Sequence, residues 1–175
     1  MSFTILESEM TFGPFSESEC FPIERCPPYT NLGDGVKMVE FVLNRPNSHQ
    51  EPVLCLVEAK HSSPRPQNQD DFSTFISEIS EKMINGVSLL FAAILERHGA
   101  REALLPASMH SIDLSRCNVR CILVIHGHAE EWLPPIQDAL RKSLLSMTKT
   151  WNFGPSSIVV LNEALAAEYS LLRVT

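Results

Sequence analysis

A carboxylate and an ammonium group stand together at the end of an apolar segment. Glu58 and Lys60 are two residues apart in VLCLVEAK, residues 53–60, so in a β-strand both side chains leave the same face. Glu40 interrupts an earlier β-branched segment, VKMVEFVLN. If the two segments pair so that Glu40 lies opposite Glu58, both carboxylates share one face, whereas a register shifted by one residue would separate them.

Two facing carboxylates and an adjacent lysine suit one kind of chemistry. The carboxylates repel each other unless a cation lies between them, and Mg²⁺ or Mn²⁺ favours such hard oxygen ligands. A lysine beside the metal can orient water and stabilise the charge of a pentavalent phosphorane. The sequence therefore predicts metal-assisted hydrolysis of phosphodiester bonds, with Glu40 and Glu58 as metal ligands and Lys60 as the third catalytic group.

Each of these residues also has a structural interpretation. An isolated Glu-x-Lys at a strand end is more often a solvated ion pair, and Glu40 is also consistent with an edge-strand charge that prevents aggregation. His61 follows the triplet and is interpreted either as a phosphate contact or as a solvated loop residue. Ser62 and Ser63 either bind a phosphate or cap the turn.

Other polar and aromatic residues form weaker patterns, and the functional interpretation is the minor one for each. Gln67 and Gln69 precede the predicted long helix and are candidates for polar residues near the site. His126 and His128 follow an apolar strand, where ligands often bind in α/β sheets, but the sequence offers them no third metal ligand. Trp132 and Trp151 are expected to pack against helix ends.

The elements that position these residues follow from hydrophobic periodicity. The segments 35–44 and 53–60 predict a hairpin. A loop and a long helix follow, starting at Asp70 or Asp71, with apolar residues at helical spacing and an end at Gly99. The segment VRCILVIHG is predicted to form the central strand of the sheet, covered on both faces. A second helix from Glu130, the strand SIVVLN and the helix EALAAEYSLL complete the order, with the last two strands parallel.

The pattern predicts one α/β domain over residues 1–175. Its core, residues 35–175, is expected to be a mixed β-sheet flanked by helices, in the order hairpin, helix, strand, helix, strand, helix. Residues 1–34 contain Pro14, Pro22, Pro27 and Pro28, which leave room only for short strands or one helical turn. We therefore expect this N-terminal segment to be irregular.

The order of elements resembles the PD-(D/E)xK nuclease superfamily, which has the restriction-endonuclease-like fold. Over about residues 20–165, the hairpin, polar loop, long helix and apolar strand follow that arrangement, and Glu58-Ala59-Lys60 matches the acid-x-Lys triplet. The resemblance implies a nuclease that uses Mg²⁺ or Mn²⁺ to cut DNA or RNA. Glu40 takes the place of the usual Asp, which is a departure because Glu is longer by a methylene. Glu24, in FPIERC, is the candidate for the additional acid that precedes the hairpin and binds the metal.

The composition limits the class of protein to which the chain can belong. The 175 residues are 44% hydrophobic and 20% charged, which excludes wholesale disorder. The longest strongly apolar stretch, residues 87–95, is about half of a membrane span, and no secretory signal is evident. Five scattered cysteines fit reduced thiols. These features predict a cytoplasmic location with no membrane contact.

The net charge of −7 is not that of a stand-alone nucleic-acid binder, which usually carries a basic excess. It favours the alternative function, a non-catalytic interaction subunit or regulator on a nuclease-like scaffold, for example in a defence or repair complex. A nuclease would need a local basic surface instead. Lys37, Arg45, Lys60, His61 and Arg65 are the candidates for it.

Overall fold

The core of the protein is a five-stranded mixed sheet. The computed structural model of the chain describes residues 1–172. The strands lie in the order β3 (Cys20–Phe21), β4 (Phe41–Asn44), β5 (Val53–Lys60), β6 (Asn118–Ile125) and β7 (Ile158–Leu161). β4 is antiparallel to both β3 and β5, whereas β5, β6 and β7 run parallel. A separate antiparallel hairpin consists of β1 (Ser2–Glu7) and β2 (Met10–Ser16).

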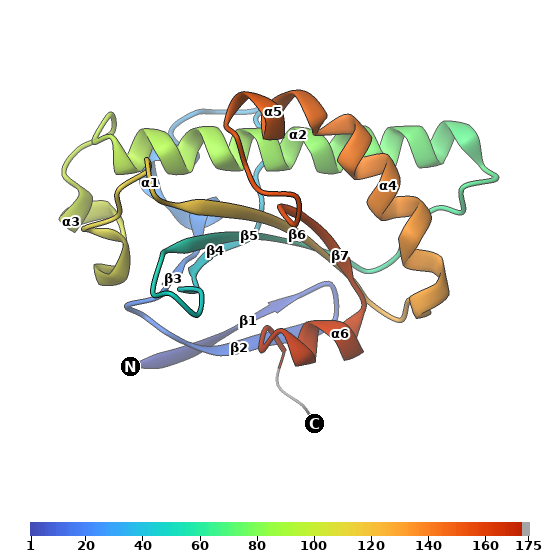
Figure 1. Ribbon diagram of the computed structural model, residues 1–175, viewed down its shortest axis with the longest axis horizontal. Helices are drawn as coiled ribbons and strands as arrows, with labels where there is room; N and C mark the ends of the chain where they lie inside the picture. The colour runs from blue at the N-terminus through green and yellow to red at the C-terminus, as the bar shows by residue number, and fades with distance from the viewer. Residues whose placement is uncertain (173–175) are drawn as a thin grey trace.

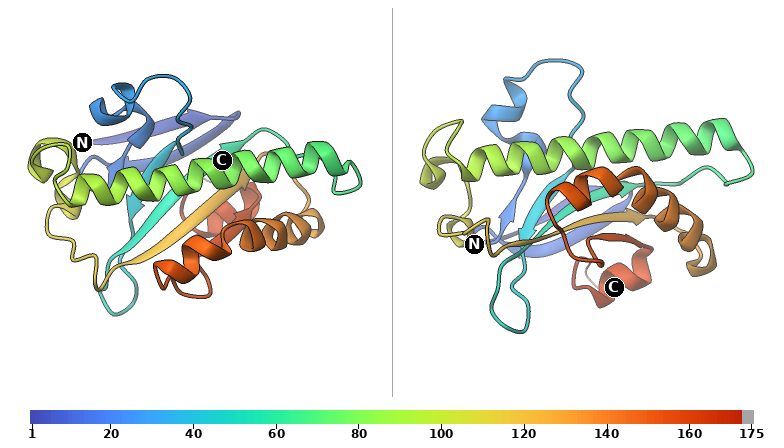
Figure 2. Two further views of the ribbon diagram at one scale, coloured as in Figure 1. Left: turned by 90° about the horizontal axis from the view of Figure 1, so that it is seen from above. Right: turned by 45° about the horizontal axis from the view of Figure 1, so that its top comes forward.

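Helices and the hairpin cover the two faces of this sheet. The long helix α2 (Gln69–Ile94), with α4 (Leu133–Ser143) and α5 (Leu145–Thr150), lies on one face, and the β1–β2 hairpin and α6 (Glu163–Glu168) lie on the other (Figure 1, Figure 2). Two single-turn helices, α1 (Pro27–Thr30) and α3 (Arg101–Leu104), belong to the connections. β5 and β6 are buried on both faces, which explains their nearly continuous apolar sequences. The predicted mixed α/β class is confirmed.

The packing of α2 on the sheet brings its side chains close to β5. Most of the predicted apolar stripe is buried, whereas Phe72 and Phe75 near its start are only partly buried. Less than 8% of each of the following residues is exposed: Ile76, Ile79, Met83, Val87, Leu90 and Ile94. Gly86 continues this contact, because a Cβ there would lie 2.8 Å from Leu56 Cδ2 and 3.0 Å from Val39 Cγ2. The missing side chain lets the helix approach β5 closely. The helix ends at Ile94, and Gly99, with φ at 115°, belongs to the turn beyond it.

The predicted hairpin forms over part of its length, and its paired residues have the register of the two alternatives that brings Glu40 towards Glu58. Phe41 pairs with Val57. Glu40 precedes the paired residues, and its backbone N–H donates to the carbonyl of Val57 at 3.0 Å. The first strand is shorter than predicted, because it begins at Phe41. The backbone before Phe41 forms hydrogen bonds with side chains instead of with a strand. Tyr29 Oη donates to the Val36 carbonyl, and Asn85 Nδ2 donates to the Lys37 carbonyl.

The N-terminal segment 1–34 is more regular than expected. The prolines are tolerated because each lies where no sheet hydrogen bond is required. Pro14 falls where the β1–β2 register shifts between Phe3 and Ile5, and Pro27 and Pro28 begin α1. The alternating segments SFTILE and MTFGPFS were the signal for the hairpin.

Two further expectations are corrected in detail. The strand order places β5 in the middle of the sheet and β6 next to it, although β6 is buried on both faces and parallel to β7, as predicted. The helix predicted from Glu130 is divided into a 3₁₀ turn at Glu130–Trp132, then α4 and α5. Pro134 and Pro135 account for the first division, because they lack the N–H groups of a continuous helix.

None of the helices within residues 1–172 combines the length and the hydrophobicity that crossing a bilayer requires. All five cysteines are free thiols, and Cys20, Cys26, Cys55 and Cys121 are buried. They contribute apolar volume to the core, as the sequence indicates.

Candidate functional site

The side chains of β5 and α2 form a buried ion cluster. Glu58 has no exposed surface, and its Oε1 lies 2.7 Å from Lys82 Nζ and 3.2 Å from Lys60 Nζ. Lys82 Nζ is also 3.7 Å from Glu40 Oε1. The predicted residues Glu40, Glu58 and Lys60 therefore share the sheet face that α2 covers, and a lysine that was not predicted lies between the two carboxylates.

A second group of carboxylates adjoins Glu40 at the edge of the sheet. One carboxylate oxygen from each of Glu7, Glu24 and Glu40 lies within 4.8 Å of the other two. Glu7 ends β1, Glu24 lies in the 3₁₀ turn Ile23–Arg25, and Glu40 precedes β4. Arg25 pairs with Glu7 at 3.4 Å and with Glu24 at 3.7 Å. The predicted ligand Glu24 is thus close to Glu40, and Glu7 joins them from the hairpin.

Burial controls the protonation of this cluster. Burial first, then the charge of Glu58 and a hydrogen bond to Glu24, raise the pKa of Glu40 to about 8. Burial also raises the pKa of Glu58, against the opposing effect of the Lys82 and Lys60 ammonium groups. For Lys82, burial alone would lower the pKa, but the carboxylates of Glu58 and Glu40 outweigh it and raise the pKa. Burial and the neighbouring acidic groups therefore favour the protonated form of Glu40 near neutral pH.

The donor set fits a hard divalent cation. Three carboxylates, Glu7, Glu24 and Glu40, offer oxygens within reach of one ion, and Mg²⁺ and Mn²⁺ prefer such ligands. Glu58 Oε2 is buried without a hydrogen-bond partner among the described residues, and an unpaired buried oxygen of this kind is costly. The predicted pair of metal ligands is therefore divided: Glu40 lies in the carboxylate group, whereas Lys60 and Lys82 contact the other oxygen of Glu58.

Glu40→Gln tests the buried proton through the pH dependence of stability. The folded-state pKa of Glu40 lies above its unfolded value, so wild-type stability decreases as pH rises towards about 8. Glutamine is neutral at every pH and does not undergo this loss. We expect the variant to melt about 2–6 °C higher than wild type at pH 9 and at nearly the same temperature at pH 5, by calorimetry without divalent ions. Equal melting temperatures of wild type and Glu40→Gln at pH 9 would show that ionisation of Glu40 does not destabilise the folded protein.

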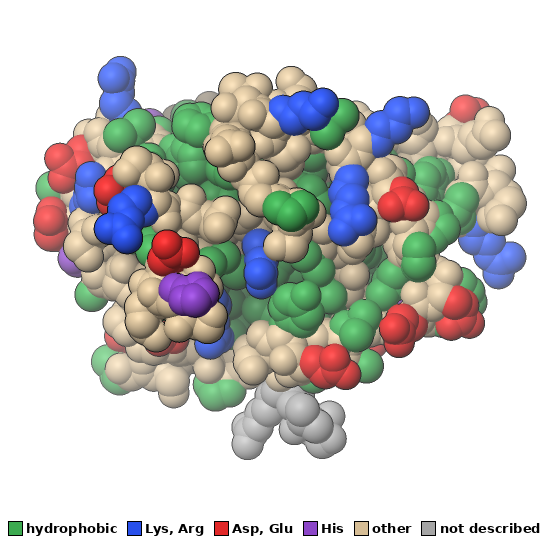
Figure 3. All heavy atoms as spheres, viewed as in Figure 1, with side chains coloured by type: hydrophobic (Ala, Val, Ile, Leu, Met, Phe, Trp, Pro, Cys, Tyr) green, Lys and Arg blue, Asp and Glu red, His purple; other side chains and the backbone are tan. Residues whose placement is uncertain are grey.

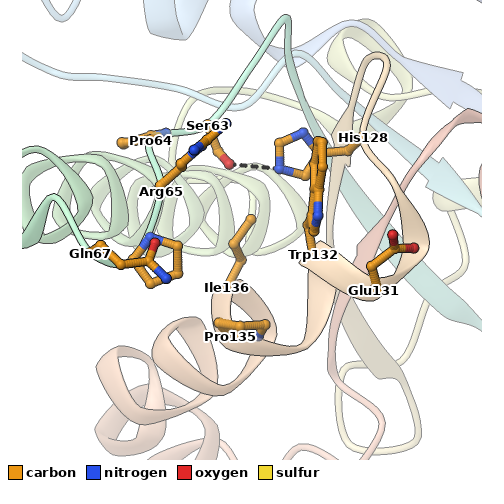
Figure 4. A pocket seen from close by; sticks show the side chains of 10 residues that line it. Ser63, Pro64, Arg65, Gln67, His128, Glu131, Trp132, Pro135 and Ile136 are labelled. Carbon is orange, nitrogen blue, oxygen red and sulfur yellow. Dashed lines mark hydrogen bonds between the residues drawn. The ribbon is translucent and has the colours of Figure 1, made fainter.

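A pocket of about 590 Å³ lies at the carboxyl ends of β5 and β6 (Figure 4). The loop after Lys60 supplies Ser63, Arg65 and Gln67, and the segment after β6 supplies His128 and Trp132. Ser63 Oγ and His128 Nε2 are 2.9 Å apart and hydrogen-bonded, and burial lowers the pKa of His128.

The other candidate residues lie in different parts of the molecule. Gln69 begins α2 and is exposed. His61 and His126 lie on the opposite face of the sheet, where their rings stack with centroids 5.2 Å apart. Trp151 packs edge-to-face on Phe91, as expected for a helix end. Trp132 is instead 54% exposed at the pocket.

Two residues of the cluster were missed for different reasons. Lys82 adjoins the buried stripe of α2, three residues after Ile79 and one before Met83; this position was the signal available for it. Glu7 depends on recognising the N-terminal hairpin, because only that element carries it to the edge of the sheet near Glu40. No family model, curated protein or solved structure matches this chain.

Proposed function

We propose that the protein is a metal-dependent nuclease with a restriction-endonuclease-like fold, which hydrolyses phosphodiester bonds of DNA or RNA. The single observation that carries the proposal is the convergence of four carboxylates and two lysines where β4 begins and β5 ends: Glu7, Glu24, Glu40, Glu58, Lys60 and Lys82. The arrangement of β4, β5, α2 and β6 supports it, because it agrees with the order of elements that the resemblance implies.

Glu7, Glu24 and Glu40 would hold Mg²⁺ or Mn²⁺. When bound, such an ion neutralises phosphate charge and lowers the pKa of water. Glu40 would release its proton on binding, because a divalent cation favours the carboxylate. The buried protein environment holds these side chains in place, so little reorganisation would accompany the reaction.

Lys60 is the lysine best placed to meet a substrate. Its side chain is 30% exposed at the end of β5, whereas that of Lys82 is 18% exposed. Glu58, at 3.2 Å, orients the Lys60 ammonium group. Lys60 would position the attacking water and stabilise charge on the phosphoryl oxygens, and Lys82 would keep Glu58 ionised.

Substrate contact would be local, because the surface lacks a broad basic region on the face in view. Lys and Arg side chains are dispersed there among acidic ones (Figure 3). Arg65 and the exposed Trp132 line the pocket next to the loop that follows Lys60, and they would contact phosphate and stack on a base, respectively. Arg45 is removed from this surface, because it lies beside Val53 at the other end of β5.

A specific observation favours the second candidate, a non-catalytic interaction subunit. Lys82 already places a positive charge between Glu40 and Glu58, and an ammonium group there can replace a metal in a purely structural cluster.

Cleavage assays with metal titrations distinguish the two functions. Labelled single- and double-stranded DNA and RNA are incubated with the purified protein and Mg²⁺, Mn²⁺, Ca²⁺ or EDTA. We expect cleavage with Mg²⁺ or Mn²⁺ and none with EDTA, together with Mn²⁺ binding by calorimetry that Glu40→Gln weakens. Absence of both cleavage and binding would refute the nuclease and support the interaction subunit.

A further inference from the structure

A second cluster of ligand-type side chains lies on the sheet face opposite α2. Glu9 belongs to the β1–β2 turn, His61 follows β5 and His126 follows β6. The His126 N–H donates to the Lys60 carbonyl at 2.9 Å, which aligns the two strand ends and stacks the imidazole rings. One ligand atom from each of the three residues lies within 4.8 Å of the others.

The two distances from Glu9 to the histidines match the edges of a small coordination polyhedron. Glu9 Oε2 is 3.4 Å from His61 Nδ1 and 3.6 Å from His126 Nε2. Neither contact is among the hydrogen bonds between the described residues. A tetrahedral ion with bonds of about 2.0–2.2 Å separates its ligand atoms by about 3.3–3.6 Å.

The hydrogen bonds of His126 direct a lone pair into the cluster. His126 Nδ1 lies 2.7 Å from Glu163 Oε1, and the other oxygen of Glu163 accepts from the Gly127 N–H at 2.7 Å. A carboxylate can only accept, so the proton of a neutral His126 ring is on Nδ1. The Nε2 lone pair of the neutral ring then faces the Glu9 carboxylate at 3.6 Å, and a cation bound between them would be attracted to both. Metal-bound histidines commonly have this second carboxylate partner.

The turn that presents Glu9 is a further argument. Ser8 and Glu9 have φ of 50° and 64°, and they form the two-residue loop between the paired residues Glu7 and Met10. Such turns favour Asn-Gly, because both central residues are left-handed. Glu9 thus occupies a position where glycine costs less, as expected if its carboxylate has a role.

The geometry points to a Zn²⁺ site formed by Glu9, His61 and His126, with Glu163 orienting His126. Two imidazoles and one carboxylate suit Zn²⁺ better than Mg²⁺, which the cluster of Glu7, Glu24 and Glu40 would bind. The fourth position is open to water, since Glu9 and His61 are exposed. A bound ion would join the N-terminal hairpin to the ends of β5 and β6.

Zinc titration of the wild-type protein tests the site independently of any nuclease activity. We expect one Zn²⁺ to bind by calorimetry and to raise the melting temperature. His126→Ala and Glu9→Gly should each abolish that rise. Glu163→Gln should weaken binding by about 10–100-fold, because it removes only the orienting carboxylate charge. Glu9→Gly is the sharpest variant, because glycine suits the turn and the protein should fold at least as well without metal.

Controls separate this site from other ligands. Glu40→Gln alters the cluster of Glu7, Glu24 and Glu40 and should leave Zn²⁺ affinity unchanged. Co²⁺ in place of Zn²⁺ should give a visible spectrum without thiolate charge-transfer bands, which excludes the cysteines. Wild-type protein that binds no Zn²⁺ at micromolar concentration, or Zn²⁺ binding that survives His126→Ala and Glu9→Gly unchanged, would overturn the assignment.

Discussion

Replacing Lys82 with methionine should lower the free energy of unfolding by about 3–5 kcal/mol at pH 7, because it leaves a buried carboxylate without its nearest cation. Lys82 Nζ lies 2.7 Å from Glu58 Oε1, and Glu58 has no exposed surface. Lys60, at 3.2 Å, would be the remaining partner. Urea denaturation followed by circular dichroism measures the change.

Two further variants show whether the loss arises from the stranded charge. Combining Lys82→Met with Glu58→Gln removes the charge of both partners and should recover a substantial part of the stability. Lys142→Met changes the same residue type at an exposed position of α4 and should alter stability by less than about 0.5 kcal/mol. A loss below about 1 kcal/mol for Lys82→Met would mean that Glu58 is neutral in the folded protein.

Replacing Lys60 with alanine should lower the rate of nucleic-acid cleavage by about 100–1000-fold, if the protein is the proposed nuclease. Lys60 is partly exposed at the end of β5, and Lys82 still pairs with Glu58 at 2.7 Å in its absence, so the variant should keep its fold. Glu40→Gln should have at least as large an effect, because a neutral amide binds divalent cations far more weakly than a carboxylate. Single-turnover rates with Mn²⁺ at saturating protein measure the chemical step.

Glu40→Asp distinguishes a metal ligand from a structural charge. It introduces the residue that the resemblance implies at this position, so activity should persist or rise. Lys149→Ala, an exposed lysine of α5, is the matched control for Lys60 and should keep the wild-type rate. If Glu40→Asp is as inactive as Glu40→Gln while the melting temperature is unchanged, Glu40 does not bind the metal in the proposed way.

Only some of the residues that the sequence offers for a basic surface lie close together in the structure. Lys60 and Arg65 lie near the same end of β5, but Lys37 pairs with Glu78 and Glu81 of α2, at 3.4 Å each. His61 faces Glu9 on the other side of the sheet. Local spacing places residues along the chain, yet it does not show which opposite charges will neutralise them.

The sequence by itself determined the hairpin that presents Glu40, Glu58 and Lys60, together with α2 and the parallel strands β6 and β7. These features follow from periods of two and 3.6 residues, which depend only on backbone geometry and on which face is buried. These periods did not decide the register, because β5 is apolar on both faces and a pairing shifted by one residue, which would separate Glu40 from Glu58, stayed open.

Only the tertiary structure decided what surrounds that hairpin. Lys82 reaches Glu58 because Gly86 lets α2 pack closely on Leu56 and Val39, and this depends on the fit of residues distant in sequence. Glu7 and Glu9 enter their clusters through an N-terminal hairpin whose prolines obscured its pattern. Long-range packing thus selects the partners of each charge, since burial and proximity depend on contacts between elements and not on the periodicity within any one of them.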